Sequence, residues 1–382
     1  MSVPATRLER LRAVLDARGL DALYVTEPSN RRYLSGFTGS AGQLLITRDD
    51  ALIASDFRYW EQIERECPGW RLFRATGPLA EWLPRLLAET TIDLGGKQLA
   101  FEAASLTYAE YQAVVKALDT LPAAQRPRFV PSHMLVEELR ATKDAEEVAL
   151  LQAAIDLGDA AFLYAASSIR PGMTESEVAR LIETSIKDHG GAGTSFPPIV
   201  AGGARGAMPH ARAGRDALVE GEGIVIDMGA LYEGYCSDLT RTVFLGTPTP
   251  RFKAVYDIVL TAQLTAAELI EPGMTGEQAH QFAQRVIEEA GFGQYFGHGL
   301  GHGIGLQVHE LPRLAPRSES RLEEGQVFSI EPGIYLSGWG GVRIEDLFII
   351  ENGRCRPLSR APKGGAYAEV ATLATLARQD KR

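Results

Sequence analysis

The sequence has few cysteines, no long apolar run and no excess of positive charge. Its 382 residues include only three cysteines, Cys67, Cys236 and Cys355, which are too few and too scattered for a disulfide framework and form no CxxC pair. The 39 Lys and Arg against 49 Asp and Glu give a formal net charge of −10, which argues against nucleic-acid binding. No apolar run approaches the roughly 18 residues of a membrane span, and the N-terminal stretch is a charged amphipathic pattern. We therefore expect a soluble, cytoplasmic protein, in which any metal would have oxygen and nitrogen ligands.

Length and patterning indicate two domains of the α/β (α+β) class. The composition is that of a globular protein, with 45% hydrophobic and 23% charged residues, and the chain is longer than one small core usually spans. Short apolar runs at 20–26, 41–47 and 50–55 predict strands, with helices at 8–18 and 58–66. After the proline-containing stretch LPAAQRPRFVPS, long helical periodicity begins. We therefore expect a smaller α/β domain over 1–130 and a second domain over 131–382.

The second domain contains an internal repeat. The segment at 169–191 aligns with that at 270–292 at an offset of 101, and both begin with a PGMT sequence. Thr174 and Thr275 suit helix N-caps, each followed three residues later by the Glu or Gln of a capping box. A strand pair is expected after each copy. This pattern predicts a duplicated helix-plus-hairpin unit with a site on the pseudo-twofold axis, fed by both halves.

Two carboxylate pairs lie on these expected hairpins. A turn centred between Tyr232 and Glu233 would place Asp227 opposite Asp238, with Cβ atoms about 5 Å apart. In the second hairpin, a turn centred on Gly338 would place Glu331 opposite Glu345. Like charges at such positions on apolar strands are costly unless a cation compensates them. The four carboxylates therefore suit a pair of divalent cations with a water or hydroxide held between them.

Histidines beside these hairpins supply further candidates. His298, His302 and His309 lie in the glycine-rich segment GHGLGHGIGLQVHE, and His210 lies upstream in GAMPHAR. Histidines flanked by this many glycines indicate close approach of the backbone to something bound. Phosphate-loop, HExxH and GxSxG motifs cannot be fitted to the chain.

These motifs together resemble the pita-bread metallopeptidases of the aminopeptidase P and prolidase branch. The resemblance rests on SFPPIVAGG, VIDMGALYEGYCSDLTRT, GHGLGHGIGLQVHE, SIEPGIY and GVRIED, in family order from Pro131 to about Leu358. The first domain resembles the creatinase/prolidase N-terminal domain through DALYVTEPSNRRYLSGFTGS and SDFRYWEQ. Nearly the whole chain is covered. The resemblance implies an N-terminal creatinase/prolidase-like domain ahead of a pita-bread catalytic domain.

The resemblance also implies roles for particular residues. It assigns the ligands of two divalent metal ions to Asp227, Asp238, His302, Glu331 and Glu345, with Asp238 and Glu345 bridging both ions. His210, His298 and His309 match the histidines that bind the substrate carbonyl and move protons, and Tyr335 and Arg343 match residues that order ligands and substrate. Mn²⁺ is the expected metal, with Zn²⁺ and Co²⁺ as alternatives. A homodimer is expected from the resemblance alone.

The expected activity is that of a Xaa-Pro aminopeptidase, acting on peptides with proline at the second position. The mechanistic hypothesis is attack by a metal-bridging hydroxide whose proton passes to Glu331. A Xaa-Pro dipeptidase is the alternative, and the motifs do not separate the two. A dipeptidase needs a cation for the terminal carboxylate, for which the candidates are Arg31, Arg32, Arg313 and Arg317. A non-catalytic pita-bread binding protein is the third hypothesis, and retention of all five ligands argues against it.

Overall fold

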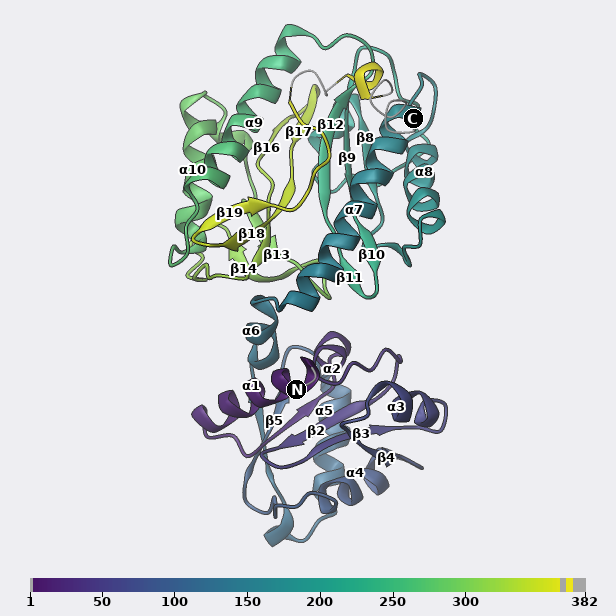
Figure 1. The fold of residues 1–382 in the computed structure, drawn as a ribbon, viewed down its shortest axis with the longest axis vertical. Helices are drawn as coiled ribbons and strands as arrows, with labels where there is room; N and C mark the ends of the chain where they lie inside the picture. The colour runs from purple at the N-terminus through teal and green to yellow at the C-terminus, as the bar shows by residue number, and fades with distance from the viewer. Residues whose placement is uncertain (1–2, 365–368, 374–382) are drawn as a thin grey trace. The chain divides into compact units, whose positions relative to one another are not determined.

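The computed structural model describes residues 3–364 and 369–373, and its fold forms two compact units, Met1–Arg140 and Ala141–Arg382. Each unit has its own secondary structure and its own buried apolar clusters. Figure 1 shows the elements of both units.

The first unit is built on a mixed sheet of six strands. The strands follow the order β4-β3-β2-β1-β5-β6, and β1 pairs antiparallel with β2 and parallel with β5. Their bounds are β1 Ala22–Val25, β2 Gln43–Thr47, β3 Ala51–Ser55, β4 Arg71–Arg74, β5 Gln98–Glu102 and β6 Arg128–Ser132. The helices are α1 Val3–Ala17, α2 Pro28–Ser35, α3 Trp60–Glu66, α4 Leu79–Ala88, α5 Tyr108–Leu118 and α6 Leu135–Ala141, with a short 3-10 turn η1 at Ala123–Gln125. The strands and helices expected in this third of the chain are confirmed.

The structure divides the chain at Arg140, further along than the position near Pro131 expected from composition. Strand β6 pairs with β5 and so belongs to the sheet of the first unit. Hydrogen bonds tie helix α6 to the same unit. The Arg140 guanidinium donates to Asn30 Oδ1 at 2.7 Å, and the Tyr33 hydroxyl donates to Leu139 O at 3.2 Å. These contacts place the residues just after Pro131 with the first unit.

The second unit has strands between two pairs of helices. Figure 1 shows α7 and α8 on one side of the strands and α9 and α10 on the other. The helices are α7 Ala145–Ser168, α8 Glu175–Asp188, α9 Pro250–Leu269 and α10 Gly276–Glu289, with short 3-10 turns η2 Gly203–Ala207 and η3 Gly293–Tyr295. The sheets have the orders β12-β9-β8, β14-β13-β15-β18-β19, β11-β10-β7 and β16-β17.

The strands of the second unit are short, and several end close to a candidate site residue. Those of the first half are β7 Gly193–Thr194, β8 Ile199–Gly202, β9 Gly223–Met228, β10 Ala230–Tyr232, β11 Tyr235–Cys236 and β12 Leu239–Phe244. Those of the second half are β13 Gly301–Gly303, β14 Glu310–Leu314, β15 Val327–Ile330, β16 Gly333–Leu336, β17 Gly340–Arg343, β18 Asp346–Glu351 and β19 Arg354–Pro357.

The predicted duplication is confirmed. Thr174 and Thr275 both cap their helices through complete capping boxes, with Glu177 and Gln278 as the reciprocal partners. Both helices also end in the same way, with a left-handed glycine directly after the C-cap residue. Each copy packs against its own apolar cluster. The two halves therefore present equivalent hairpins to each other.

Helix α7 is long and apolar enough to cross a membrane by length and composition. It nevertheless has a structural role in the second unit, because Leu151, Ile155 and Phe162 along its length are buried in the apolar clusters. Asp159 of the same helix accepts a hydrogen bond from the Arg360 backbone N–H at 2.5 Å. These contacts are those of a core helix of a folded unit.

The register of the first hairpin differs from the expected one. Asp227 lies opposite Thr240, and Asp238 is therefore not its partner. The turn lies one residue further along than expected, at Glu233 and Gly234, whose φ angles of 43° and 78° are those of a two-residue hairpin turn. Moving the turn centre by one residue shifts the pairing by two. Because side chains alternate along a strand, Asp227 and Asp238 stay on the same face.

The register of the second hairpin is as expected. Gly333 pairs with Arg343 and Ile330 pairs with Asp346. The intervening Glu331 and Glu345 therefore face each other where the two strand pairs meet. A bridge between Thr240 and Glu345 joins this hairpin to the first.

Candidate metal centre

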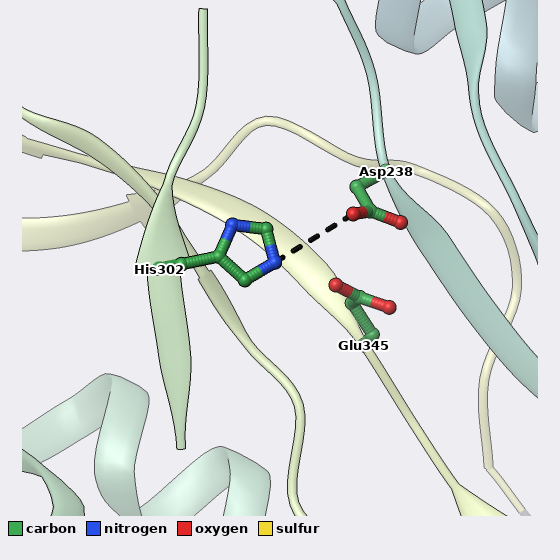
Figure 2. A group of neighbouring side chains, drawn as sticks. All are labelled: Asp238, His302 and Glu345. Carbon is green, nitrogen blue, oxygen red and sulfur yellow. Dashed lines mark ion pairs between the residues drawn. The ribbon is translucent and has the colours of Figure 1, made fainter. Parts of the chain in front are cut away.

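Three side chains converge between the two hairpins. Asp238, His302 and Glu345 each offer one ligand atom, and these atoms lie within 4.8 Å of one another. Asp238 lies between β11 and β12, His302 in β13, and Glu345 directly before β18, so the cluster draws on both halves of the duplication. Figure 2 shows the imidazole of His302 pointing toward the two carboxylates.

Glu331 and Asp227 extend this cluster. His302 Nε2 lies 3.4 Å from Glu331 Oε1 and 3.7 Å from Asp238 Oδ2. Asp227 accepts a hydrogen bond from the Arg343 guanidinium at 2.5 Å. Burial, with repulsion from Asp227 and Glu331, raises the pKa values of Asp238 and Glu345, so the four carboxylates interact electrostatically. The structure thus brings together all five residues to which the resemblance gives a ligand role.

The tautomer of His302 leaves one nitrogen available to a ligand. Its Nδ1 lies 3.1 Å from the carbonyl oxygen of Gly303. Because a carbonyl oxygen can only accept, Nδ1 carries the hydrogen and the lone pair is on Nε2, which faces the carboxylates. A backbone carbonyl holding the second ring nitrogen is the usual arrangement for a metal-binding histidine.

Unpartnered oxygens test whether these residues suit a cation. Asp227 Oδ1, Asp238 Oδ1 and Glu345 Oε1 are buried, and no group among the described residues donates a hydrogen bond to them. A buried carboxylate oxygen without a donor is costly. A divalent cation would satisfy such oxygens, and carboxylates with one imidazole suit Mn²⁺ and admit Zn²⁺ or Co²⁺. The donor set therefore fits a metal site.

The pKa values of the metal-free cluster reflect the same crowding. Burial, with repulsion from Glu345 and neighbouring carboxylates, raises the pKa of Asp238 well above its ordinary value. Burial and repulsion from Glu331 do the same to the pKa of Glu345. Burial raises the pKa of Glu331 to about 7 and lowers the pKa of His302. A bound cation would favour the charged carboxylates and so lower the pKa values that burial and repulsion raise.

Two residues that the sequence analysis did not single out hold the ligands in place. The Ser329 hydroxyl accepts from the backbone N–H of His302 at 3.1 Å and donates to Glu331 Oε1 at 3.1 Å. The Thr240 hydroxyl donates to Glu345 Oε2 at 2.6 Å. Ser329 lies two positions before Glu331. Thr240 lies two positions after Asp238 and opposite Asp227. Alternation along the strand is the signal that could have found them.

Close backbone packing explains part of the glycine-rich segment. A Cβ on Gly301 would lie 1.9 Å from the carbonyl oxygen of Ser329. Strand β13 therefore approaches β15 more closely than any side chain would allow. This approach sets the distance of His302 from Glu331.

A hydrogen-bonded chain of polar side chains borders the cluster. Arg343 donates to the Tyr335 hydroxyl at 2.9 Å, and that hydroxyl lies 3.0 Å from His298 Nε2. The Nδ1 of His298 lies 2.7 Å from Gly299 O and so carries a hydrogen, which makes Nε2 the acceptor. Burial lowers the pKa of His298 to about 4. His298 is therefore a neutral imidazole near neutral pH.

The other two candidate histidines lie beside the cluster. The His309 ring lies 4.3 Å from the His302 ring between centroids, and burial lowers the pKa of His309. His210 is exposed and follows Pro209, whose carbonyl oxygen accepts from Arg343 at 3.5 Å. A positive charge on His210 would lower the pKa values of His298, His309 and Glu331. All three histidines expected around the centre thus surround it.

The arginines considered for binding a terminal carboxylate differ in their exposure and in their distance along the fold from the ligands. Arg31 is buried in the first unit and donates to the Gly39 and Gly42 carbonyl oxygens at 2.7 and 2.8 Å, which is a structural role. Arg313 is exposed and lies opposite His302 in the β13–β14 pair, so the two side chains share a face. Arg317 is exposed four residues further along.

Comparisons with known proteins agree with this geometry. Residues 149–352 match metallopeptidase family M24, and residues 7–142 match the creatinase/prolidase N-terminal domain. A Xaa-Pro dipeptidase of Pyrococcus furiosus is 34% identical over 92% of this chain and 97% of its own.

Two solved structures are similar along nearly their whole length. A Xaa-Pro dipeptidase from Bacillus anthracis has a TM-score of 0.89 at 39% identity, covering 94% of this chain and 99% of its own. An X-Pro aminopeptidase from Thermotoga maritima has a TM-score of 0.84 at 35% identity, covering 94% and 98%. The expected family and fold are confirmed. The chain belongs to metallopeptidase family M24, in the branch of the prolidases and aminopeptidase P, and is a metal-dependent peptidase.

Proposed function

We propose that this chain hydrolyses the peptide bond before proline, with Xaa-Pro dipeptides as its principal substrates. One observation carries the metal-dependent chemistry: the convergence of five ligand-type side chains around buried carboxylate oxygens that have no donor among the described residues. Relatives along the whole chain that are named Xaa-Pro dipeptidase support the substrate class. The aminopeptidase activity expected from the sequence becomes the second candidate, supported by the likeness to the Thermotoga maritima X-Pro aminopeptidase.

The metal ligands in this proposal are Asp227, Asp238, His302, Glu331 and Glu345, holding two divalent cations, with Mn²⁺ favoured. When bound, such cations would polarise the substrate carbonyl and make water a stronger nucleophile near neutral pH.

The chain's own residues would then move the proton and position the substrate. Glu331 is the group proposed to take the proton of the attacking water, because its carboxylate lies beside the ligand His302 and accepts a hydrogen bond from Ser329. His309 borders the same space and would donate a hydrogen bond to the oxygen that becomes negative. His298 would accept a hydrogen bond from the Tyr335 hydroxyl and so orient it. Arg343 and Tyr335 would hold this arrangement through their mutual hydrogen bond.

Arg313 is proposed to select for dipeptides. It shares a face with His302 across the β13–β14 pair, and its positive charge acts on His309. A guanidinium at this position would bind the free carboxylate of the proline in a dipeptide. In a longer peptide that carboxylate is absent, and a residue follows the proline instead.

The proposal also includes cytoplasmic location and a homodimer. A cysteine count of only three, with two of them buried, suits a reducing compartment. The dimer is a prediction from family resemblance.

Side-by-side hydrolysis assays test the activity. The metal-free protein should hydrolyse nothing, and added Mn²⁺ should restore cleavage of a Xaa-Pro dipeptide over a Xaa-Pro-Xaa tripeptide and a Met-Ala-Xaa peptide. Glu331→Ala should stay folded and lose turnover. Cleavage of the tripeptide alone would favour the aminopeptidase, and full activity without metal would contradict the metal-dependent mechanism.

Arg313→Ala tests the selection of dipeptides. Loss of a charge-assisted hydrogen bond worth about 1.5–3 kcal/mol should lower kcat/KM for a Xaa-Pro dipeptide by roughly 10- to 100-fold. Hydrolysis of a Xaa-Pro-Xaa tripeptide should change little. Arg317→Ala is the matched control and should behave like the wild type. An equal loss on both substrates would show that Arg313 does not read the carboxylate.

The pKa of Glu331 predicts a pH effect on stability without metal. A carboxyl group whose pKa is raised on folding stabilises the protein at low pH, and this contribution is lost as the pH rises from about 4.5 to about 7. Metal-free Glu331→Gln should therefore gain stability relative to the wild type across this window, by about 3 kcal/mol. Because both proteins keep His298, its opposite trend cancels. Urea unfolding at several pH values measures the difference, and a pH-independent difference would refute the prediction.

A further inference from the structure

Behind the candidate metal centre, one buried glutamine lies between the strands that carry two of the ligands. Gln263 of α9 is fully buried. Its Nε2 lies 3.2 Å from the carbonyl oxygen of Ile330 and 3.4 Å from that of Ile344. Ile330 directly precedes Glu331, and Ile344 directly precedes Glu345. A single amide group therefore joins the two backbones immediately before the two glutamates.

Lys363 fixes the orientation of this amide. Its Nζ donates to Gln263 Oε1 at 2.8 Å and pairs with Asp346. Because an ammonium group can only donate, the amide oxygen must face Lys363, and the amide NH₂ must then face the two carbonyl oxygens. The NH₂ also lies 3.1 Å from Asp346 Oδ2. Without the ammonium, the amide oxygen would lose its hydrogen-bond donor, and only the acceptors around the NH₂ would hold the amide in place.

Arg241 holds the same region from the other side. Its guanidinium donates to the Glu345 carbonyl oxygen at 2.6 Å and to Asp346 Oδ1 at 2.5 Å. Both oxygens of the buried Asp346 therefore have cationic partners, one from β12 and one from the segment after β19. The pair of Arg241 and Asp346 is costly to disturb, because both side chains are buried and charged.

The segment that carries Lys363 is itself anchored at several points. The Leu358 N–H donates to Leu347 O at 2.8 Å, and the Arg360 N–H donates to Asp159. Arg241 donates to the carbonyl oxygens of Ala361 and Pro362 at 2.8 and 3.2 Å. These backbone contacts place Lys363 next to Asp346 and do not depend on the Lys363 side chain.

We propose that Gln263 and Lys363 are positioning residues that fix the spacing of Glu331 and Glu345 from behind. This inference rests on the proposed function, in which both glutamates are metal ligands. Neither residue contacts a ligand oxygen, so their effect passes through the backbones of Ile330 and Ile344. Residues that orient metal ligands typically change metal affinity by roughly 10- to 100-fold when they are replaced.

Metal binding by the full chain tests the inference. Mn²⁺ affinity of the metal-free protein would be measured by titration calorimetry for the wild type, Lys363→Met, Gln263→Met and Lys363→Arg. We expect about a tenfold loss of affinity for both methionine variants and recovery in Lys363→Arg, which keeps a cation of similar reach. The absorption spectrum of the Co²⁺-loaded protein should shift in the methionine variants, since it reports ligand geometry. With Mn²⁺ bound, kcat should fall and KM should stay near the wild-type value.

A matched control and a fold measurement separate positioning from general damage. Arg360→Met changes an exposed side chain of the same segment and keeps the backbone N–H that Asp159 accepts, so metal binding should be unchanged. Lys363 is partly exposed, so its replacement by Met should leave the metal-free protein folded, as thermal unfolding would show.

The outcomes distinguish this inference from the function on which it rests. Wild-type Mn²⁺ affinity and an unshifted Co²⁺ spectrum in both methionine variants would overturn the positioning role and leave the proposed function standing. Equal losses in Arg360→Met and Lys363→Met would also overturn it. A wild-type protein that neither binds Mn²⁺ nor hydrolyses Xaa-Pro peptides would contradict the proposed function itself.

Discussion

Like charges held together in a buried space are the constraint on which this structure depends. Four carboxylates meet between two hairpins, and three of their oxygens are buried without a donor among the described residues. Burial and repulsion make this arrangement unfavourable in the metal-free, ionised state, as the raised pKa values of Asp238 and Glu345 show. A cation turns the same repulsion into binding energy. The site is therefore a feature whose cost in stability is explained by its function.

Duplication supplies the geometry that brings the charges together. Each half contributes a capped helix and a hairpin, and each hairpin places one acidic residue on either side of its turn. Close glycine packing then brings β13 against β15, which sets His302 beside Glu331. Arg343, Thr240 and Ser329 each donate a hydrogen bond to one carboxylate oxygen of a ligand. One ligand atom each of Asp238, His302 and Glu345 then lies within 4.8 Å of the others.

Sequence patterning predicted the duplication, the second hairpin and the acidic residues, because these follow from capping motifs and from alternation along strands. It misjudged the first hairpin, although Gly234 is a local signal for a turn at Glu233 and Gly234, because glycine readily adopts the positive φ that a two-residue turn requires. The shift of two positions preserved the shared face of Asp227 and Asp238, so the error did not reach the site. For Arg31, the sequence was misleading about function. The residue was considered for binding a substrate carboxylate, but its guanidinium is buried and donates to backbone carbonyl oxygens. Gln263 could not have been found from sequence, because its partners are distant along the chain.

Anomalous diffraction from crystals equilibrated with Mn²⁺, measured at the manganese absorption edge, tests the central claim most directly. The account predicts anomalous density between Asp238, His302 and Glu345, with a second peak toward Asp227, in contact with carboxylate oxygens of both hairpins. Manganese bound only elsewhere on the protein, with this cluster free of anomalous density, would contradict it.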